Sequence, residues 1–367
     1  MGIKYYTLDK ILEQHAQYNI IYGERSNGKT TSVLAYGLKN HIQSGYEDQI
    51  AIIRRWDEDY KGKNGQQMFE GIVALGWVEE WTKGKYNAIY YFSQRWYLCQ
   101  YDSKGEKKAQ AAEPFALGFA INCEEHYKST SYPNVKTVLF DEFITRSYYL
   151  PDEFVKYQNL LSTIIRLRTD VTIFMCGNTI NKYCPYFKEM GLTGVKQQKR
   201  GSIDLYTYGD TKLRVAVEYS DFPSKKKESN MYFAFNNPKL QMITNGGWEI
   251  DIYPHLPHKY LPKDVLYFFY LIFDGEMLQG NVISVDNTIF IYFHRKTTPI
   301  REDNTQLVYQ QKTDYRRNYR IDIMKPFSKV EKFIVELIKK RKVFYQDNEV
   351  GEVFNNYLKW CGSEDIT

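Results

Sequence analysis

Short apolar runs alternate with helical segments over the first half of the chain. Four runs have the length and composition of buried strands, namely Tyr18–Tyr22, Gln49–Ile53, Val135–Phe140 and Val171–Cys176. Between them, residues 28–43 and 154–168 repeat apolar positions at the spacing of a helix. Short buried strands separated by helices predict an α/β fold, with a mostly parallel sheet covered on both faces.

The second half of the chain differs in composition and in its pattern of apolar residues. Residues 220–258 are rich in lysine, asparagine, glycine and proline, which predicts a linker or lid. Three apolar runs then predict an antiparallel meander, and they are Leu266–Phe273, Asn281–Ser284 and Thr288–Phe293. Ser328 and Glu331 form a capping-box pattern that opens a helix, and a last helix follows.

These patterns predict three regions, at residues 1–208, 209–258 and 259–367. The first is an α/β domain, the second the linker or lid, and the third a smaller α+β domain. Residues 61–108, which are rich in tyrosine, are expected to add a helix and a β-hairpin to the first domain. The total of 367 residues agrees with two or three domains.

Composition excludes several classes of protein. Apolar residues make up 43% and charged residues 25%, so we expect a folded chain. The longest apolar run, Val265–Phe273, is far shorter than the ~20 residues of a membrane helix, so we expect no membrane span and no secretion signal. Five scattered cysteines fit a reducing cytoplasm. The net charge of +5 is compatible with nucleic-acid binding but does not imply it.

A phosphate-binding motif follows the first predicted strand. Gly23-Glu-Arg-Ser-Asn-Gly28-Lys29-Thr30 fits G-x-x-x-x-G-K-Ser/Thr and opens a predicted helix. Backbone N–H groups of such a loop form a nest for anions, and the lysine reaches the β- and γ-phosphates. We therefore predict a nucleotide site formed by Gly23, Ser26, Asn27, Gly28, Lys29, Thr30 and Thr31, with the Thr30 hydroxyl as a ligand of Mg²⁺.

Two acids end the third predicted strand. Asp141 is placed to hold Mg²⁺ opposite Thr30, and Glu142 can act as the general base for an attacking water. A solvated turn is the alternative for such a pair, but the upstream glycine loop favours ATP hydrolysis. The guanine-reading Asn-Lys-x-Asp of switch GTPases is not found. Asn178, at the end of the fourth strand, either senses the γ-phosphate or is a turn residue.

Two arginines end the second predicted helix. Arg166 or Arg168 could reach a neighbouring subunit's nucleotide and stabilise the transition state. Alternatively, both could bind the carbonyl groups at the end of their own helix. Spacing alone favours the second interpretation.

These motifs together resemble one family. Residues 128–143, which include Tyr132-Pro133-Asn134-Val135 before the acid pair, are similar to the DNA-packaging ATPases of salasvirus-type phages, the group around phage phi-twenty-nine. The resemblance continues through Leu160–Arg168, Asn178 and Pro185–Phe187. It also includes Arg25 and the pair Arg54-Arg55, and it covers roughly residues 6 to 188.

The resemblance implies an ASCE-type P-loop ATPase that uses ATP and Mg²⁺. Such proteins form a homopentameric ring at the portal vertex of the empty capsid, in the host cytoplasm, and drive double-stranded DNA inside. Arg166 then matches a trans-acting arginine finger, and Lys128 a second trans-acting basic residue. Arg25 and Arg54 or Arg55 match arginines near the nucleotide and the ring interface. Whether a packaging RNA is a further partner is left open.

The resemblance leaves the contacts to DNA unsettled. The family's DNA-gripping lysine follows the arginine pair, where this chain has Trp56-Asp57-Glu58-Asp59. The role is therefore assigned to Lys61 or Lys63. Lys225, Lys226 and Lys227 are further candidates, with a solvated linker as the alternative.

The family's C-terminal domain resembles an RNase H-type nuclease with a decayed active site. Leu266–Phe273 carries no acid, and Asp274, Asp286 and Asp322 are the remaining candidate metal ligands. Two alternatives stay open. One is a terminase-like enzyme with an active C-terminal nuclease, and the other is a P-loop ATPase that is not a motor.

Overall fold

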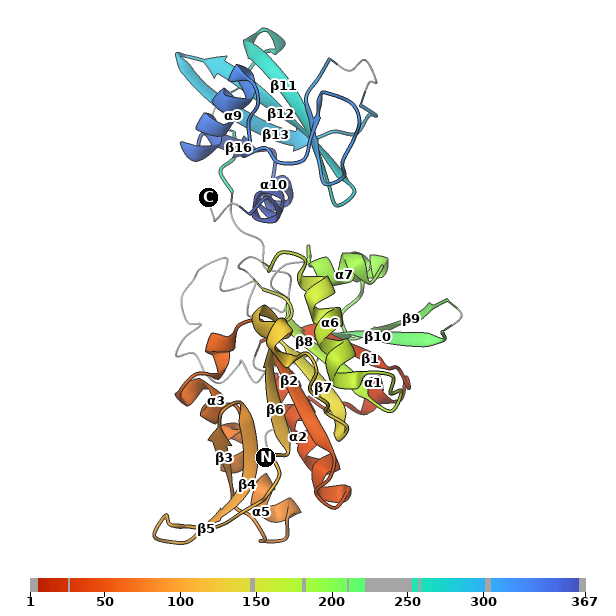
Figure 1. The fold of residues 1–367 in the computed structure, drawn as a ribbon. Helices are drawn as coiled ribbons and strands as arrows, with labels where there is room; N and C mark the ends of the chain where they lie inside the picture. Colours follow the sequence, from red (N-terminus) through yellow and green to blue (C-terminus); the bar gives the residue numbers. More distant parts are fainter. Residues whose placement is uncertain are drawn as a thin grey trace. The chain divides into compact units, whose positions relative to one another are not determined.

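The computed structural model describes residues 6–25, 27–145, 149–179, 183–209, 211–221, 253–256, 259–300 and 305–362. The chain divides into two compact units. One comprises Met1–Thr145 with Leu150–Trp248, and the other comprises Arg146–Tyr149 with Glu249–Thr367 (Figure 1). No helix among the residues described above has both the length and the apolar character needed to cross a membrane.

A ten-stranded sheet organises the N-terminal unit, in the order β3-β4-β6-β2-β7-β8-β1-β10-β9, with β5 paired to β4. Its central strands run parallel, and they are β6 (Ala116–Ala120), β2 (Gln49–Arg54), β7 (Val135–Asp141), β8 (Thr172–Asn178), β1 (Tyr18–Gly23) and β10 (Leu213–Ser220). The four strands predicted from apolar runs are confirmed, and their near-complete burial explains why they are apolar throughout.

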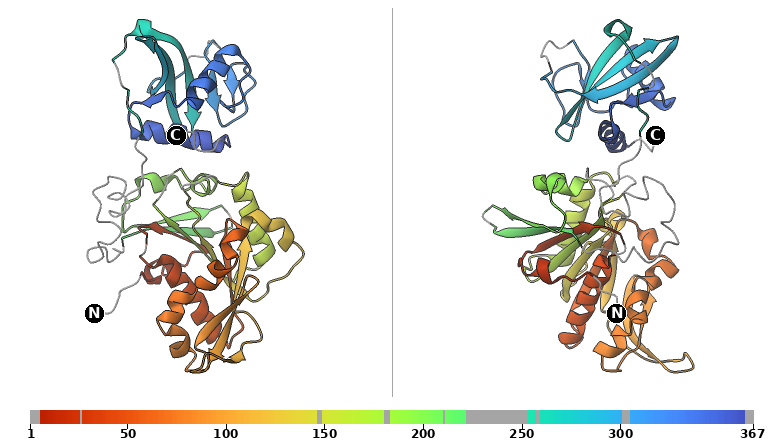
Figure 2. Two further views of the ribbon diagram at one scale, coloured as in Figure 1. Left: turned by 90° about the vertical axis from the view of Figure 1, so that its left-hand side faces the viewer. Right: turned by 180° about the vertical axis from the view of Figure 1, so that it is seen from behind.

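Two long helices cover opposite faces of this sheet. The path β1–α2–β2 crosses the sheet in one direction and β7–α6–β8 in the other, so right-handed crossovers place α2 (Lys29–Gln43) and α6 (Glu153–Ile165) on different faces (Figures 1 and 2). Neighbouring residues of β7 confirm this. Leu139 belongs to the apolar cluster that includes Val33 of α2, while the ring of Phe140 lies 5.0 Å from that of Tyr157 in α6.

Three features of this unit differ from the sequence prediction. Strands β6, β9 (Ile203–Tyr208) and β10 were not predicted, and β10 lies within the segment 209–258 that was expected to be a linker. Strand β10 belongs to the sheet because its residues Val215–Ser220 pair with β1 along the whole length of β1. Helix α6 ends at Ile165 rather than at residue 168, because Arg166 takes a left-handed conformation with φ 55°.

The tyrosine-rich insertion extends one edge of the sheet. The predicted hairpin is confirmed as β3 (Ala88–Phe92) and β4 (Arg95–Tyr101), and β5 (Lys107–Gln110) is added. Instead of one helix there are three short ones, α3 (Lys63–Gln67), α4 (Glu70–Ala74) and α5 (Trp77–Trp81). The remaining short elements are α1 (Asp9–Leu12), η1 (Asp57–Tyr60), η2 (Ile121–Tyr127), α7 (Pro185–Glu189) and η3 (Thr193–Gln197).

The C-terminal unit contains a six-stranded sheet in the order β15-β14-β11-β12-β13-β16. The predicted meander is confirmed as β11 (Val265–Phe273), β12 (Glu276–Val285) and β13 (Thr288–Arg295), which are antiparallel. The other elements are η4 (Pro262–Asp264), β14 (Val308–Gln310), β15 (Tyr319–Arg320), α9 (Lys329–Lys339), β16 (Val343–Tyr345) and α10 (Asn348–Trp360). The Ser328 hydroxyl caps α9 by accepting a hydrogen bond from the Glu331 N–H at 3.1 Å.

Two candidate metal ligands of this unit lie far apart. Asp274 lies in the turn before β12 and Asp286 in the turn after it, so a ten-residue strand separates them. At about 3.3 Å per residue that distance is near 30 Å, too far for one metal site. Asp322 forms an ion pair with Lys325 at 3.2 Å.

Candidate nucleotide site

The glycine loop is held between strand β1 and helix α2. Gly23 is the last residue of β1 and lies against β10, where a Cβ atom would approach the Ser220 carbonyl oxygen to 3.0 Å. Gly28 precedes α2 with φ 93°, a conformation that favours glycine. The loop therefore requires glycine at both ends for geometric reasons.

Lys29 points into a ring of oxygen atoms. Its ammonium group donates to the Asn27 side-chain oxygen at 3.1 Å and to that of Asn178 at 3.4 Å, as well as to the Glu24 carbonyl. The residue is 5% exposed, and burial lowers the pKa of its ammonium group to about 8. Asn178 lies beside Gly23 because β8 is the neighbour of β1.

Thr30 and Asp141 meet at the carboxyl ends of the strands. The Thr30 hydroxyl donates to Asp141 Oδ1 at 2.7 Å. These are the hydroxyl and carboxylate donors that Mg²⁺ prefers, so their chemistry fits a Mg²⁺ site between glycine loop and acid pair. The structure thus brings together the two residues that the sequence predicted as metal ligands.

Arg54 bridges both acids of the pair. Its guanidinium group lies 2.7 Å from Asp141 Oδ2, 2.9 Å from Glu142 Oε2 and 3.2 Å from Asp59 Oδ2. Burial disfavours its charge, but the three carboxylates outweigh this effect and raise the pKa of Arg54. Glu142 itself is well exposed, with φ 58°, and its carboxylate is the outermost of the two acids.

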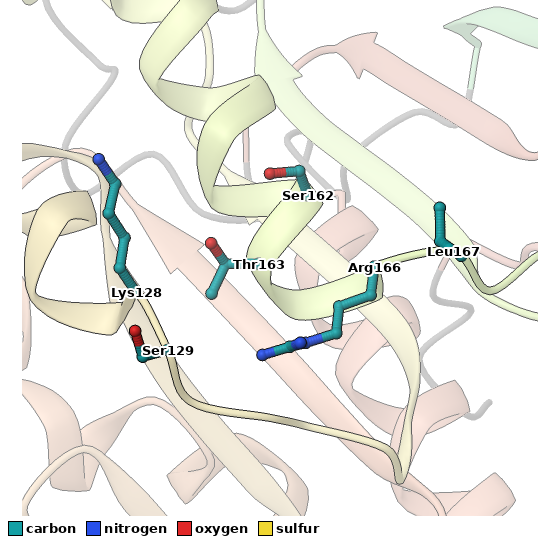
Figure 3. Close-up of a pocket in the computed structure, with 6 residues that line it drawn as sticks. All are labelled: Lys128, Ser129, Ser162, Thr163, Arg166 and Leu167. Carbon is teal, nitrogen blue, oxygen red and sulfur yellow. The ribbon is translucent and has the colours of Figure 1, made fainter.

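Arg166 and Lys128 line one open pocket, away from the glycine loop. The pocket has a volume of about 400 Å³, and its lining includes Ser129, Ser162, Thr163 and Leu167 (Figure 3). The Arg166 guanidinium donates to the Thr130 carbonyl at 3.0 Å, and Lys128 forms an exposed ion pair with Glu125. The two basic residues that the resemblance implied to act in trans therefore lie together on one surface.

Arg168 is bound differently from Arg166. Its guanidinium donates to five backbone carbonyl groups at 2.6–3.1 Å, those of Tyr132, Pro133, Val135, Ile164 and Ile165. For Arg168 the structural alternative of a helix-end arginine therefore holds. The contacts of Arg168 with residues 132–135 also place the nearby Arg166 close to the first residue of β7. Asp141 is the last residue of this seven-residue strand, so it lies about 20 Å away.

Other predicted site residues are only partly described. Ser26 and Lys225, Lys226 and Lys227 lie outside the described residues. Arg25 and Thr31 are half-buried in the loop and in the first turn of α2. Lys61 is exposed and forms ion pairs with Asp57 at 3.4 Å and Glu58 at 3.2 Å, and Lys63 is exposed at the start of α3. The roles predicted for these residues stay predictions.

The sequence analysis did not identify several charged and polar groups that pack against the nucleotide site. Arg200 pairs with Glu24 of the glycine loop at 2.5 Å, and Tyr6 donates to the buried Glu218 of β10. A buried pair of Arg55 and Glu153 supports the acid pair. The run Leu213–Ser220 is rich in β-branched and aromatic residues and could have revealed β10. No local sequence pattern predicts that Glu24 pairs with a residue as distant in the chain as Arg200.

Comparisons with known proteins agree with the resemblance seen in the sequence. Residues 105–234 match the family described as podovirus DNA encapsidation protein (Gp16). The DNA packaging protein of Bacillus phage PZA is 23% identical over 331 residues, which cover 86% of this chain and 89% of that protein. This chain is similar to phage DNA-packaging proteins.

Two further matches extend the comparison. The DNA packaging protein of Bacillus phage phi29 is 27% identical over 186 residues, about half of each chain. The solved structure of the Phi-28 gp11 DNA packaging motor covers 98% of both chains with a TM-score of 0.51 and 17% identity, which supports the similarity of fold. The resemblance to phi29-like packaging proteins is confirmed.

Proposed function

We propose that this chain is an ATP-hydrolysing subunit of a motor that moves double-stranded DNA into a preformed phage capsid. The observation that carries the proposal is the site at the carboxyl ends of β1, β8 and β7. There Lys29 lies 3.4 Å from Asn178 and Thr30 lies 2.7 Å from Asp141. Strand β8 lies between the glycine-loop strand and the acid-pair strand, which is the order expected for an ASCE-type ATPase.

The site's own residues supply the phosphate-binding, metal-binding and general-base groups that hydrolysis needs. The glycine loop and Lys29 bind the ATP phosphates, and Thr30 and Asp141 would hold Mg²⁺, which neutralises charge on the phosphates. Glu142 accepts a proton from the attacking water. Its carboxylate is bound by Arg54 in this structure, so Glu142 becomes a base only when Arg54 releases it.

The pocket of Lys128 and Arg166 supports a ring. Arg166 is about 20 Å from the site of its own chain, yet its side chain is exposed and makes one hydrogen bond with the described residues, to the Thr130 carbonyl, as a group that serves a neighbour would. Each site would then be completed by the next subunit of a homopentamer at the portal vertex. A packaging RNA could take part in docking to the procapsid.

The C-terminal unit fits a domain of the RNase H type. A three-stranded antiparallel meander is extended beyond β11 by the parallel strands β14 and β15. We propose that this domain no longer cuts DNA, since Asp274 and Asp286 lie at opposite ends of β12. Cleavage of DNA by the protein with Mg²⁺ or Mn²⁺ would instead support the terminase-like alternative.

DNA-dependent ATP hydrolysis tests the proposal. A motor must move along any sequence, so its contacts should be to phosphates, and binding should weaken steeply between about 50 and 200 mM salt. We expect double-stranded DNA of unrelated sequences to stimulate hydrolysis equally. Lys63→Ala should reduce the salt dependence, and Lys359→Ala in the C-terminal unit is the matched control. Hydrolysis that is indifferent to DNA would favour a P-loop ATPase that is not a motor.

A further inference from the structure

A buried ion pair lies directly behind the acid pair. Arg55 follows strand β2, and Glu153 is the first residue of helix α6. The guanidinium Nε lies 2.8 Å from Glu153 Oε2, and Nη2 lies 2.9 Å from Oε1. Their side chains are only 7% and 1% exposed, so both charges are removed from water.

The same guanidinium group also binds the turn that carries Glu142. It donates to the Phe143 carbonyl at 3.0 Å and to the Glu142 carbonyl at 3.3 Å. The Glu153 carboxylate in turn accepts from the Leu150 N–H at 2.7 Å and from the Tyr186 hydroxyl at 2.8 Å. One ion pair thus joins the end of β2, the turn after β7 and the first turn of α6.

Stability alone does not account for this arrangement. Burying two charges costs free energy, and well-packed apolar residues of the same volume often stabilise a fold equally well. What a bidentate guanidinium adds is a fixed direction for the groups that it binds. Glu142 benefits from such support, because its φ of 58° is a left-handed conformation that costs a non-glycine residue free energy.

We propose that Arg55 and Glu153 are positioning residues that hold the Glu142 turn in the conformation needed for proton transfer. The proposal rests on the proposed function, since it takes Glu142 as the base. Arg54 binds the Glu142 carboxylate, whereas Arg55 binds its backbone carbonyl. Arg55 therefore keeps the turn in place after Arg54 has released the carboxylate, and the two adjacent arginines have separate tasks.

Steady-state hydrolysis by Arg55→Lys and Glu153→Gln tests this role. A base misplaced by about 1 Å can cost on the order of 10²-fold in rate. We expect kcat to fall by roughly 10- to 100-fold while the KM for ATP stays within about threefold, because the glycine loop is untouched. Both variants should bind a fluorescent ATP analogue like the unmodified protein, which shows that they are folded. Native kcat in both variants, or a loss of ATP binding that matches the loss of rate, would overturn the proposal.

A double variant separates positioning from general damage. If Arg55 acts through Glu142, Arg55→Lys should add less than about threefold to the defect of Glu142→Gln. A defect that multiplies fully with that of Glu142→Gln would contradict the proposal. Tyr186→Phe is the matched control, since it removes a hydrogen bond to Glu153 but leaves the guanidinium contacts with the turn. Its kcat should stay within about threefold of native.

The proposed function is tested separately in the same assay. Unmodified protein that hydrolyses no ATP with DNA present would refute the proposed function, and the positioning role would fall with it. Active unmodified protein together with native kcat in both variants would refute the positioning role alone.

Discussion

Charged groups lie near both ends of strand β7, but the group at the carboxyl end is bound within the chain whereas the group near the start is exposed. At the carboxyl end, Asp141 is bound by Thr30 and Arg54 at 2.7 Å each, and its side chain is 14% exposed. Near the other end, Arg166 reaches an open pocket and contacts the Thr130 carbonyl at 3.0 Å. The groups proposed to act on the chain's own nucleotide are thus fixed within the subunit. Arg166, which is proposed to act on a neighbour's nucleotide, remains accessible on the surface.

The largest effect is expected from Lys29→Ala, in the nucleotide site at the carboxyl end of β7. ATP binding and hydrolysis should both be lost, because the charge that contacts the phosphates is removed. The fold should remain, because the glycine loop owes its conformation to Gly23 and Gly28 rather than to the ammonium group. Lys39→Ala on the same helix is the control and should retain activity. Measurable turnover by Lys29→Ala would refute the assignment of the glycine loop.

Glu142→Gln should slow hydrolysis by roughly 10²- to 10⁴-fold and leave ATP affinity within about threefold. Only the base is lost, because Asp141 and Thr30 are unchanged. Nucleotide should accumulate in long-lived complexes, which rapid filtration with labelled ATP can measure. Asp141→Asn, by contrast, should weaken Mg²⁺-dependent binding. Equal losses of binding in the two variants would contradict separate roles for the two acids.

A smaller effect is expected from pH. The Lys29 ammonium has a pKa of about 8 in the unliganded protein, so it is charged below that pH and neutral above it. ATP binding requires the charged form, and affinity should therefore fall by up to about tenfold per pH unit above pH 8. Titration calorimetry at pH 9 in two buffers of different ionisation enthalpy should show proton uptake on binding. ATP affinity that is constant from pH 7 to pH 9.5, with no proton uptake, would contradict the requirement for a charged Lys29.

The smallest effects are the changes in the free energy of unfolding that we expect from substitutions near the start of β7. Arg168→Ala removes five hydrogen bonds to carbonyl groups and should lower the free energy of unfolding by about 1–3 kcal/mol. Arg166→Ala removes one exposed contact and should change it by less than about 0.5 kcal/mol. Urea unfolding followed by circular dichroism measures both. A larger loss for Arg166→Ala would indicate that it is structural.

Local sequence patterns were sufficient for much of the fold and the site. The apolar runs at β1, β2, β7 and β8 predicted the sheet because strands buried on both faces must be apolar. The glycine loop predicted the pairing of Thr30 with Asp141, since parallel strands deliver their carboxyl ends to one edge.

Contacts between distant segments could not be predicted in the same way. Arg55 and Glu153 are 98 residues apart, and Arg200 and Glu24 are 176 apart, so no local period links them. The end of α6 was placed too late because the left-handed turn at Arg166 has no glycine to mark it. Strand β10 was missed because its neighbourhood resembles a linker in composition.

Mixing two inactive variants tests the central contrast most directly. Arg166→Ala should bind ATP normally but lose on the order of 10³-fold in hydrolysis, as expected for an arginine finger. Combined with Glu142→Gln under conditions in which rings assemble, it should regain activity, because some interfaces then pair an intact base with an intact arginine from the neighbour. Dilution that dissociates the rings should abolish the regained activity. Mixed rings that form but stay inactive, or Arg166→Ala that is active alone, would contradict the assignment of Arg166 to a neighbour's site.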